Sequence, residues 1–548
     1  MTDGYAGTQG SIGWIGKMKK NSFIQGAVIL AVSGIIVKLI GAVSRIYLSR
    51  LLGGEGIGLY QMAYPIYLLC LSISTAGLPV AISIMVSERN AIHDFLGGQR
   101  ILKIALSVLT LTGLLFSVGL FFGSSVLIDH HIVRDPRAYW SLIALAPAVF
   151  CATISATMRG YFQGLQNMTP TAVSEVIEQF IRVVTMIGLA IILLPKGLEF
   201  GAAGATFGAA PGAAAAILTL GWFYWHDRKH RKMWYMSQDK SIVPDSTWNI
   251  MKRLFILAIP VSCANIMIPI VSNIDLFIVP KRLEVAGFNV EQATTLFGYL
   301  TGMATALINM PTIVTSSMSS SLVPGISEAS IKKDFDTIRR RARTALRLAS
   351  VFTLPAAIGL GVIATPISTM LYATPNAGPC IAVMSIGIFF LGIQQVTTGI
   401  LQGLGKTAVP FINLIVSGCV KVAFSWNLTA MPQFGVLGAA FATDTDFAVA
   451  AALNLLFLYR YMRFNMDYGH LLKVAIASAV MGVAVYFSFG AIIGAIHSNT
   501  LSALLAICIG VVVYALGILL TKAIKPEDVR TMPKIGPKLA AIIEKISF

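Results

Sequence analysis

Residues 23–52 read FIQGAVILAVSGIIVKLIGAVSRIYLSRLL, an almost entirely apolar run that nevertheless carries Lys38 and Arg45. About 20 apolar residues span the hydrocarbon core of a bilayer, so this run is long enough to cross with a tilt. A lone cation at bilayer depth costs about 2.5–3.5 kcal/mol, so both should face a wet cavity or a partner. Because they are seven positions apart, they share one helical face, about 10 Å apart. We interpret this face as the lining of a path for an anion.

The composition of the whole chain is that of a polytopic membrane protein. Of its 548 residues, 56% are hydrophobic and only 12% are charged, and long apolar runs recur to the end. The sequence therefore predicts an all-α fold. Its apolar runs predict fourteen transmembrane helices, at residues 24–48, 58–87, 100–122, 138–162, 169–194, 202–225, 254–279, 293–323, 345–371, 380–403, 407–428, 435–459, 471–494 and 500–521.

The distribution of positive charge predicts the orientation. If the N-terminus is cytoplasmic, the segments on that side hold 31 of the 41 lysines and arginines, and the outer segments hold six. Such an excess is the positive-inside pattern, and it places both termini in the cytoplasm. The net charge of +17 then faces anionic membrane lipid, and no nucleic-acid partner is needed to explain it.

Cysteine and histidine give no sign of a metal or cofactor site. The six cysteines are scattered singly, without CxxC spacing, and the seven histidines fall in loops or at helix ends. Isolated cysteines in such a chain behave as small buried apolar residues. We therefore predict no cofactor and no metal centre, apart from a candidate sodium site near Asp275.

An internal repeat divides the chain. GYFQGL at residues 160–165 recurs as GILQGL at 399–404, and FGAAGATF at 200–207 recurs as FGVLGAAF at 434–441. Two copies of a six-helix unit are therefore expected, with the same orientation in the membrane. The predicted domains are a cytoplasmic N-terminal tail at 1–23, an N-lobe at 24–226, a basic cytoplasmic linker at 227–253, a C-lobe at 254–460, two added helices at 461–523 and a cytoplasmic amphipathic tail at 524–548.

Charged residues inside predicted spans are the most specific functional signal. Nine such residues, each costing about 3 kcal/mol if it faced lipid, require water or partners. The repeat offset of 239 carries Arg182 onto Lys421, so each lobe holds a cation at the same depth. The candidate substrate ligands are the cations Lys38, Arg45, Arg182 and Lys421. The candidate ion-coupling or charge-pairing groups are Glu175, Glu178, Asp275 and Asp444, and Asp446 is the ninth charged residue.

The helix predicted at 169–194 places Glu175, Glu178 and Arg182 on one face, with Glu178 four residues before Arg182. That order favours an internal ion pair, and an internal pair and a substrate site are equally good interpretations of this trio. Lys38, Arg45 and Lys421 have no acidic residue one turn away, which favours a cavity lining. The main alternative is an Arg45 side chain that snorkels to the interface.

Two further carboxylates invite different interpretations. Asp275 lies near the outer end of its helix beside Asn273 and Ser272, a set that suits a hard cation such as sodium or a protonatable coupling site. A salt bridge to a first-helix cation is an equal alternative for Asp275. Asp444 and Asp446 are two residues apart, so at most one of them faces a given groove.

The sequence from residue 53 to 88, GGEGIGLYQMAYPIYLLCLSISTAGLPVAISIMVSE, following a first helix with Lys38 and Arg45, resembles the SpoVB family. That family belongs to the multidrug/oligosaccharidyl-lipid/polysaccharide (MOP) exporter superfamily, with MurJ lipid II flippases, Wzx-type flippases and MATE drug exporters. The resemblance extends over nearly the whole chain. It implies a two-lobed, MATE/MurJ-like transporter of the bacterial plasma membrane that moves undecaprenyl-diphosphate-linked glycans outward by alternating access.

The resemblance also implies roles for particular residues. First-helix cations of MurJ-like proteins contact the diphosphate in the central cavity, and Lys38 and Arg45 match them here. Asp275 matches an aspartate that belongs to the sodium site of some members. MurJ-like proteins carry further arginines on their second and eighth helices, whereas residues 66–86 and 296–323 have none. Arg182 and Lys421 would then supply the missing positive charge.

The leading hypothesis is a flippase for lipid II or a related lipid-linked polysaccharide, and not an enzyme. A diphosphate is an anion that cations in a low-dielectric cleft attract strongly. The expected partners are the lipid-linked glycan diphosphate, membrane lipids and cell-wall synthesis proteins. One alternative is a MATE-like drug antiporter driven by sodium or protons, against which Lys38 and Arg45 count. Another is a membrane factor for spore or wall assembly that does not transport.

Overall fold

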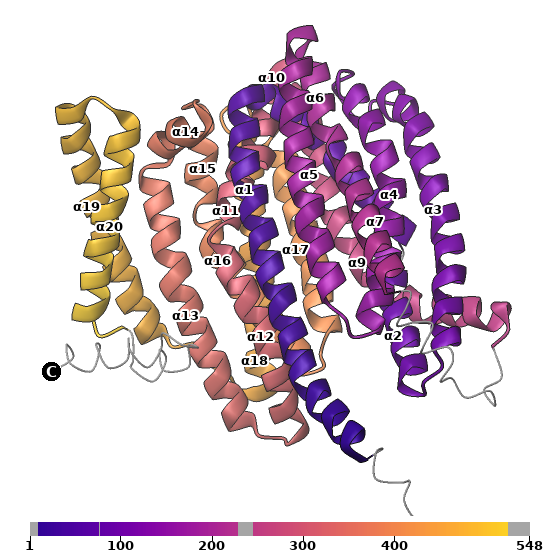
Figure 1. Cartoon of the computed structure of the whole chain (residues 1–548). Helices are drawn as coiled ribbons and strands as arrows, with labels where there is room; N and C mark the ends of the chain where they lie inside the picture. Colours follow the sequence, from indigo (N-terminus) through magenta and orange to yellow (C-terminus); the bar gives the residue numbers. More distant parts are fainter. Residues whose placement is uncertain (1–8, 76, 228–244, 524–548) are drawn as a thin grey trace, which may run out of the picture. The chain divides into compact units, whose positions relative to one another are not determined.

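The computed structural model describes residues 9–75, 77–227 and 245–523, and every regular element within these ranges is a helix (Figure 1). Helices are the expected outcome in a bilayer, because each one satisfies its backbone hydrogen bonds internally. The predicted amphipathic tail at 524–548 and most of the basic linker lie outside the described residues. The predicted N-terminal tail is partly helical, since the first helix begins at Gln9.

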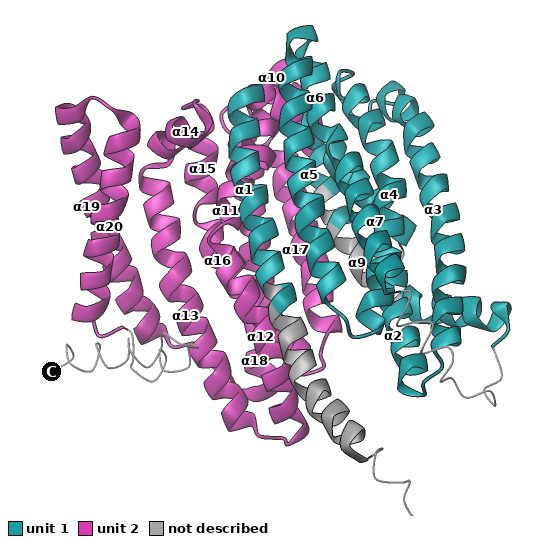
Figure 2. Ribbon diagram, viewed as in Figure 1, with its two compact units in different colours: residues 1–52, 59–276 teal, residues 53–58, 277–548 magenta. Residues whose placement is uncertain are grey.

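The chain forms two compact units, which Figure 2 colours separately. Unit 1 comprises residues 1–52 and 59–276, and unit 2 comprises residues 53–58 and 277–548. The elements of unit 1 are most of α1 (Gln9–Thr75), α2 (Leu78–Ala91), α3 (Phe95–Asp129), α4 (Ala138–Gly164), α5 (Thr169–Leu193), the short 3-10 helix η1 (Leu194–Lys196), α6 (Leu198–Phe207), α7 (Ala209–His226) and the first three quarters of α9 (Thr247–Val285).

Unit 2 contains the remaining helices, including a π-helical turn. Its elements are α10 (Val290–Phe297), the π-helix η2 (Gly298–Ala304), α11 (Thr305–Asn309), α12 (Thr312–Ile331), α13 (Phe335–Val362), α14 (Ala364–Tyr372), α15 (Gly378–Met384), α16 (Gly387–Gly403), α17 (Ala408–Leu428), α18 (Val436–Met462), α19 (Tyr468–Ile496) and α20 (Asn499–Leu520).

Ten described helices are long and apolar enough to cross a membrane, or twelve when each bent pair counts as one span. The bent pairs are α10–α11 with α12, at 57°, and α15 with α16, at 42°. The run Val32–Ala91 counts as a single candidate although the sequence predicts two helices there. The structure therefore shows an all-helical polytopic membrane protein.

The boundaries of the units differ from those of the predicted lobes. The sequence places the first division in the basic linker at 227–253, whereas unit 1 extends to Leu276 inside α9. Ile250, Leu254 and Ala258 explain this, because they belong to a buried core with residues of α2, α3, α4 and α7. Similarly, α19 and α20 are part of unit 2, since Val474 and Ile518 are buried against α13.

The predicted repeat has a structural counterpart in how two helices cross within each unit. In unit 1, a Cβ placed on Gly160 of α4 would lie 2.5 Å from the carbonyl oxygen of Pro79 in α2. In unit 2, a Cβ on Gly399 of α16 would lie 2.7 Å from the carbonyl oxygen of Ser319 in α12. Each glycine permits a backbone approach that a side chain would prevent. Helices α2 and α12 therefore occupy equivalent places in their units.

A glycine-rich segment breaks α1. Gly53 has φ +66° and ψ −173°, a conformation that interrupts the helix and that glycine adopts most readily. The following residues belong to unit 2, where they lie against α10 and η2. A Cβ on Gly58 would meet the carbonyl oxygen of Thr294 at 2.1 Å, and one on Gly298 would meet that of Gly54 at 2.0 Å. Small residues at these positions thus allow two helices to touch backbone to backbone.

Substituting Gly58 with alanine is expected to destabilise unit 2 by about 2–3 kcal/mol, because the new methyl group would press on a backbone atom that cannot rotate away. Gly123→Ala is the matched control, since nothing lies within 4 Å of a Cβ at that helical position. Alanine there should leave stability unchanged or raise it by up to about 1 kcal/mol. Thermal melting of the purified variants in detergent measures both effects. Equal melting temperatures for the two variants would show that the contact is not tight.

Aspartates cap three helices at their N-termini. Asp94, Asp334 and Asp467 accept hydrogen bonds from the backbone N–H groups of Gly97, Thr337 and His470. These bonds satisfy N–H groups that have no partner within the helix. The bond from His470 and the neighbouring Arg347 guanidinium, which donates through Nε at 3.0 Å, lower the pKa of the Asp467 carboxyl.

Candidate functional site

The cationic face of α1 borders α5 within unit 1. Lys38, Gly41 and Arg45 lie three and four residues apart, so they share one face of the helix. A Cβ on Gly41 would lie 3.3 Å from the side-chain nitrogen of Gln179 in α5, which places this face against that helix (Figure 1). The predicted common face of the two cations is therefore turned toward α5.

The two cations differ in their surroundings. Lys38 is exposed, and no described residue forms an ion pair or hydrogen bond with it. Arg45 is half-buried, and its Nη1 donates to Oε1 of Gln61 at 3.3 Å. The guanidinium carbon of Arg45 also lies 5.8 Å from the centre of the Tyr60 ring, within the range of a cation–π contact. Arg45 is thus held in position by neutral groups and keeps its full positive charge available.

A second cationic group lies on α4 and α5. Glu178 bridges two arginines, accepting from Nη2 of Arg159 at 2.6 Å and from Nη2 of Arg182 at 2.5 Å. Arg159 Nε also donates to the hydroxyl of Ser174 at 3.0 Å. The three charged side chains are only 14–21% exposed. The ion pair expected from the spacing of Glu178 and Arg182 is therefore confirmed, and it leaves one net positive charge.

Arg159 belongs to this charged group, but the sequence analysis did not name it as a site residue. The predicted helix at 138–162 contains it, but it was counted with the cations on the cytoplasmic side; it lies inside α4, five residues before that helix ends. Its depth is explained by Ser174 and Glu178, which are one turn apart on α5 and both accept from it. The signal available in the sequence was this i, i+4 pair of acceptors, which needs a donor on a neighbouring helix when it lies inside a membrane.

The predicted charged residues of unit 2 are buried. Lys421 is 5% exposed and lies on the buried face of α17 with Ser417 and Ser425, so it does not line an open surface. Arg182, its counterpart under the repeat, has a side chain that is 21% exposed. Asp444 and Asp446 of α18 are also buried. Of the four predicted substrate cations, Lys38, Arg45 and Arg182 belong to unit 1, and Lys421 belongs to unit 2.

The carboxylates are likewise distributed over both units. Glu175 is half-buried on α5, one turn before Gln179. Asp444 of α18 faces the break between α15 and α16. A Cβ on Gly387, at the start of α16, would lie 2.3 Å from its Oδ1. Neither side-chain oxygen of Asp444 has a hydrogen-bond partner among the described residues. A group buried in this way requires a proton or a bound cation to remain in the apolar interior.

The sodium site near Asp275 stays a prediction, and the structure places the Asn273 amide in other contacts. Asp275 is half-buried on α9, and the Asn273 amide donates to the carbonyl oxygens of Pro65 at 3.0 Å and Pro269 at 2.7 Å. Residues two apart on a helix diverge by about 200°, so Asn273 and Asp275 do not converge on one ion. The side chain of Ser272 lies outside the described residues. Within the described residues, no group of three or more His, Cys, Asp or Glu could hold a metal.

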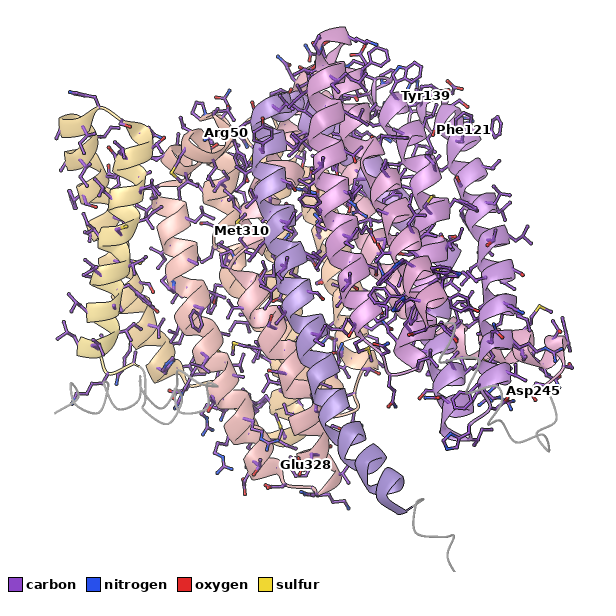
Figure 3. The ribbon with its side chains drawn as sticks, in the orientation of Figure 1. Arg50, Phe121, Tyr139, Asp245, Met310 and Glu328 are labelled. Carbon is purple, nitrogen blue, oxygen red and sulfur yellow. The ribbon has the colours of Figure 1, made fainter. Side chains whose placement is uncertain are left out.

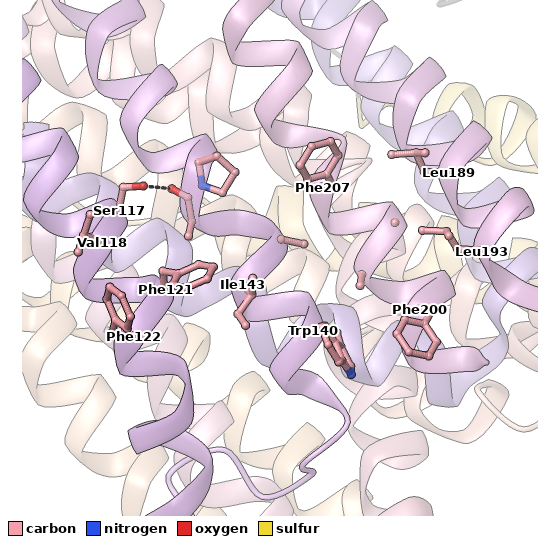
Figure 4. A pocket seen from close by; sticks show the side chains of 15 residues that line it. Ser117, Val118, Phe121, Phe122, Trp140, Ile143, Leu189, Leu193, Phe200 and Phe207 are labelled. Atoms are coloured by element: carbon pink, nitrogen blue, oxygen red, sulfur yellow. Dashed lines mark hydrogen bonds between the residues drawn. The ribbon is translucent and has the colours of Figure 1, made fainter. Parts of the chain in front are cut away.

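An apolar pocket lies elsewhere in unit 1. It has a volume of about 590 Å³ and is lined by side chains of α3, α4, α5 and α6, including Phe121, Trp140 and Phe200 (Figure 4). Its one hydroxyl, on Ser117, donates to the carbonyl oxygen of Ala146 at 2.7 Å, as Figure 4 shows. The lining has no charged group, so this pocket suits hydrocarbon and cannot be the site of an anion. Phe121 and Tyr139 lie at the end of unit 1 opposite Asp245 (Figure 3).

Comparison with known proteins places the chain among membrane transporters. Residues 23–330, more than half of the chain, match the family described as "Polysaccharide biosynthesis protein". Residues 299–514 match the family "Lipid II flippase MurJ". The chain is 29% identical to "Stage V sporulation protein B" of Bacillus subtilis, over 95% of this chain and 99% of that protein. It is 25% identical to "Lipid II flippase MurJ" of the same organism, over 85% and 88% of the two chains.

Solved structures show the same fold. "Lipid II flippase MurJ, inward closed conformation" aligns with a TM-score of 0.67 at 16% identity, over 90% of this chain and 98% of that one. An inward-facing MATE multidrug transporter of the MOP superfamily aligns with a TM-score of 0.64 at 16% identity, over 80% and 98% of the two chains. The chain belongs to the polysaccharide biosynthesis protein family of the MOP exporter superfamily, and it is a transporter related to SpoVB and MurJ, not an enzyme.

Proposed function

We propose that this transporter flips lipid II, or a related polyprenyl-diphosphate-linked glycan, from the inner to the outer leaflet by alternating access. The chain would cross the bacterial plasma membrane fourteen times, with both termini in the cytoplasm. The observation that carries the proposal is the cationic face of α1, where exposed Lys38 and half-buried Arg45 lie two turns apart beside the Arg182 helix. Relatives named for lipid II flipping and for sporulation support the substrate class.

The charge of the unit 1 site favours an anion over a cationic drug. Its four cations, Lys38, Arg45, Arg159 and Arg182, outnumber its two carboxylates, Glu175 and Glu178. Glu178 is held by two arginines and so cannot serve as the open carboxylate that a drug cation requires. Lysine and arginine bind phosphate oxygens through charge-assisted hydrogen bonds. A diphosphate with a lipid tail is therefore a better match than a cationic drug.

Movement of the anion is also favoured by the membrane potential. With the cell interior negative, expelling one negative charge gains about 2.3 kcal/mol per 100 mV. Lys38 and Arg45 would bind the diphosphate on the inner side and release it on the outer side. Asp275 and Asp444 would serve as coupling or charge-pairing groups. In this proposal Lys421, which is buried in unit 2, acts only when unit 2 rearranges to expose it.

Reconstituted vesicles test the proposal. Lipid II with a fluorescent head group should move to the other leaflet in vesicles that contain the protein, and an external quencher reports the movement. Other polyprenyl-diphosphate glycans, tested in parallel, identify the preferred head group. Restored wall synthesis in a cell depleted of its flippase separates transport from a scaffold role. Vesicles in which no such lipid moves faster than in protein-free vesicles would overturn the proposal.

A further inference from the structure

Helix α12 exposes a row of serines within a stretch of chain that spans a membrane. The sequence from residue 312 to 324, TIVTSSMSSSLVP, holds five serines and two threonines. Ser317, Ser320 and Ser321 are exposed and Ser316 is half-buried. At 100° per residue these four side chains lie within about 140° of one face of the helix. We call Ser316, Ser317, Ser320 and Ser321 the serine face.

Packing does not explain the serine face. The opposite side of α12 attaches the helix to α16, where the hydroxyls of Thr315 and Ser319 donate to the side-chain and backbone oxygens of Gln395 at 2.6 and 2.7 Å. The serine face takes no part in these contacts. Its hydroxyls bond only to their own helix, since Ser317 donates to Ile313 at 2.9 Å and Ser321 to Met318 at 2.8 Å.

The exposed faces of α20 and α3 carry large apolar residues, as contact with lipid requires. On α20 the exposed positions include Leu504, Val511 and Leu516, and on α3 they include Leu111 and Leu115. Offset by the 240 residues that relate Pro79 to Ser319, the position equivalent to Ser320 is Val80, which is 44% exposed. The serines are therefore particular to α12 and are not inherited from the repeated packing.

The hydrogen-bonding state of the serines indicates what they can bind. A serine hydroxyl has one donor and two acceptor lone pairs, and in Ser317, Ser320 and Ser321 the donor is used by the helix backbone. The serine face therefore presents a row of neutral acceptors. Asn309 is exposed at the end of α11, before the 57° bend that leads into α12, and its amide offers both a donor and an acceptor. Sugar hydroxyls and acetamido N–H groups are donors that match such a row, whereas a diphosphate offers only acceptors.

The serine face lies well inside unit 2. Figure 3 shows Met310 in the middle of that unit and Glu328 at one end of it. With a rise of 1.5 Å per residue, Ser317 and Ser321 lie roughly 10–17 Å from Glu328 along α12. Ser321 lies one turn from Gly325, whose carbonyl oxygen accepts from Arg341 of α13. Ser316 and Ser317 lie farther from the basic residues and are the better placed to meet a transported head group.

We propose that the serine face of α12 binds the carbohydrate part of the transported lipid. This inference rests on the proposed function and deepens it. The serine face contributes neutral hydrogen bonds to the sugar. Residues 296–323 lack arginine and lysine, which fits a contact with an uncharged ligand group. Selectivity among glycans would then come from α12, and retention of the phosphates from α1.

Water accessibility is the first test, and it does not depend on transport. Single cysteines at 317 and 320, in a variant whose six native cysteines are replaced, are treated with a charged maleimide in opened membranes. Both should react, because a glycan path is wet. Ser107→Cys is the matched control. Ser107 is exposed, and its hydroxyl donates to the backbone of α3 at 3.0 Å. It lies at a similar depth, twelve residues from the start of α3, while Ser320 lies eleven residues from the end of α12. Reaction at 107 but not at 317 or 320 would overturn the proposal.

Binding is the second test. The Ser317→Ala, Ser320→Ala, Ser321→Ala variant should bind a polyprenyl-diphosphate glycan about tenfold or more weakly, because several hydrogen bonds are lost. Its affinity for the same polyprenyl diphosphate without sugar should be unchanged, and Ser107→Ala should bind both lipids normally. Equal weakening for both lipids, or for neither, would overturn the sugar contact. Wild-type protein that bound neither lipid would instead overturn the proposed function.

Discussion

Replacement of both Lys38 and Arg45 with alanine is expected to lower the rate of glycan-lipid flipping about a hundredfold or more. Each cation would form charge-assisted hydrogen bonds with the diphosphate, worth about 1.5–3 kcal/mol apiece, and a loss of 1.4 kcal/mol is a factor of ten. Since Lys38 is exposed and Arg45 is held by a single hydrogen bond to Gln61, the fold should survive the change. Flipping in reconstituted vesicles measures the effect, with melting temperature as the check on folding.

Two variants sharpen this experiment. Lys38→Arg keeps the charge and should retain most of the activity. Lys103→Ala removes an exposed cation of α3 that is outside the site and should flip normally. If the double alanine variant were folded and flipped at the wild-type rate, the cationic face of α1 would not be the phosphate site. The proposal would then lose the observation that carries it.

Replacement of Glu178 with alanine is expected to produce the largest loss of stability in unit 1, about 3 kcal/mol. The change leaves Arg159 and Arg182 without their shared carboxylate, and their side chains are only 19% and 21% exposed. Removing one partner of a buried ion pair is far more costly than the pair is worth, because a desolvated charge remains. Arg182 Nε is already buried without a hydrogen bond, so little compensation is available to it.

The control for Glu178 is an ion pair of the same spacing on the surface. Glu328 and Lys332 lie 2.6 Å apart at i, i+4, with both side chains more than 60% exposed. Such exposed pairs contribute little, so Glu328→Ala should melt close to wild type. Adding Arg159→Leu to Glu178→Ala should restore part of the lost stability, because it removes one of the unpaired charges. A double variant that melts lower still would contradict the ion-pair explanation.

Much of the unit 1 site could be predicted from spacing alone. Lys38 and Arg45 share a face because seven residues make two helical turns, and Glu178 meets Arg182 because four residues make one turn. These are properties of a single helix, so they do not depend on how helices pack. Arg159 could not be placed in the same way, because its partners are on another helix and it lies close to the predicted end of its own helix.

Predictions that depended on how the helices pack agree with the structure only in part. The repeat offset correctly relates Gly160 to Gly399, because close backbone crossings constrain both positions to be small. It also relates Arg182 to Lys421, yet α17 buries Lys421 while Arg182 stays partly exposed. Sequence offset reports position along a helix but not which way the equivalent face is covered. The boundary of unit 1 also depends on packing, since unit 1 ends inside α9 and not in the basic linker.

The sequence by itself determined that this chain is an all-helical membrane protein with cations on the first helix, since apolar length and charge cost are local quantities. Only the tertiary structure decided which charges meet: that Glu178 joins two arginines from different helices, that Lys421 is buried, and that the serines of α12 are exposed. The physical reason is that hydrophobicity and helical periodicity act within one segment, whereas burial and pairing depend on which segments lie side by side.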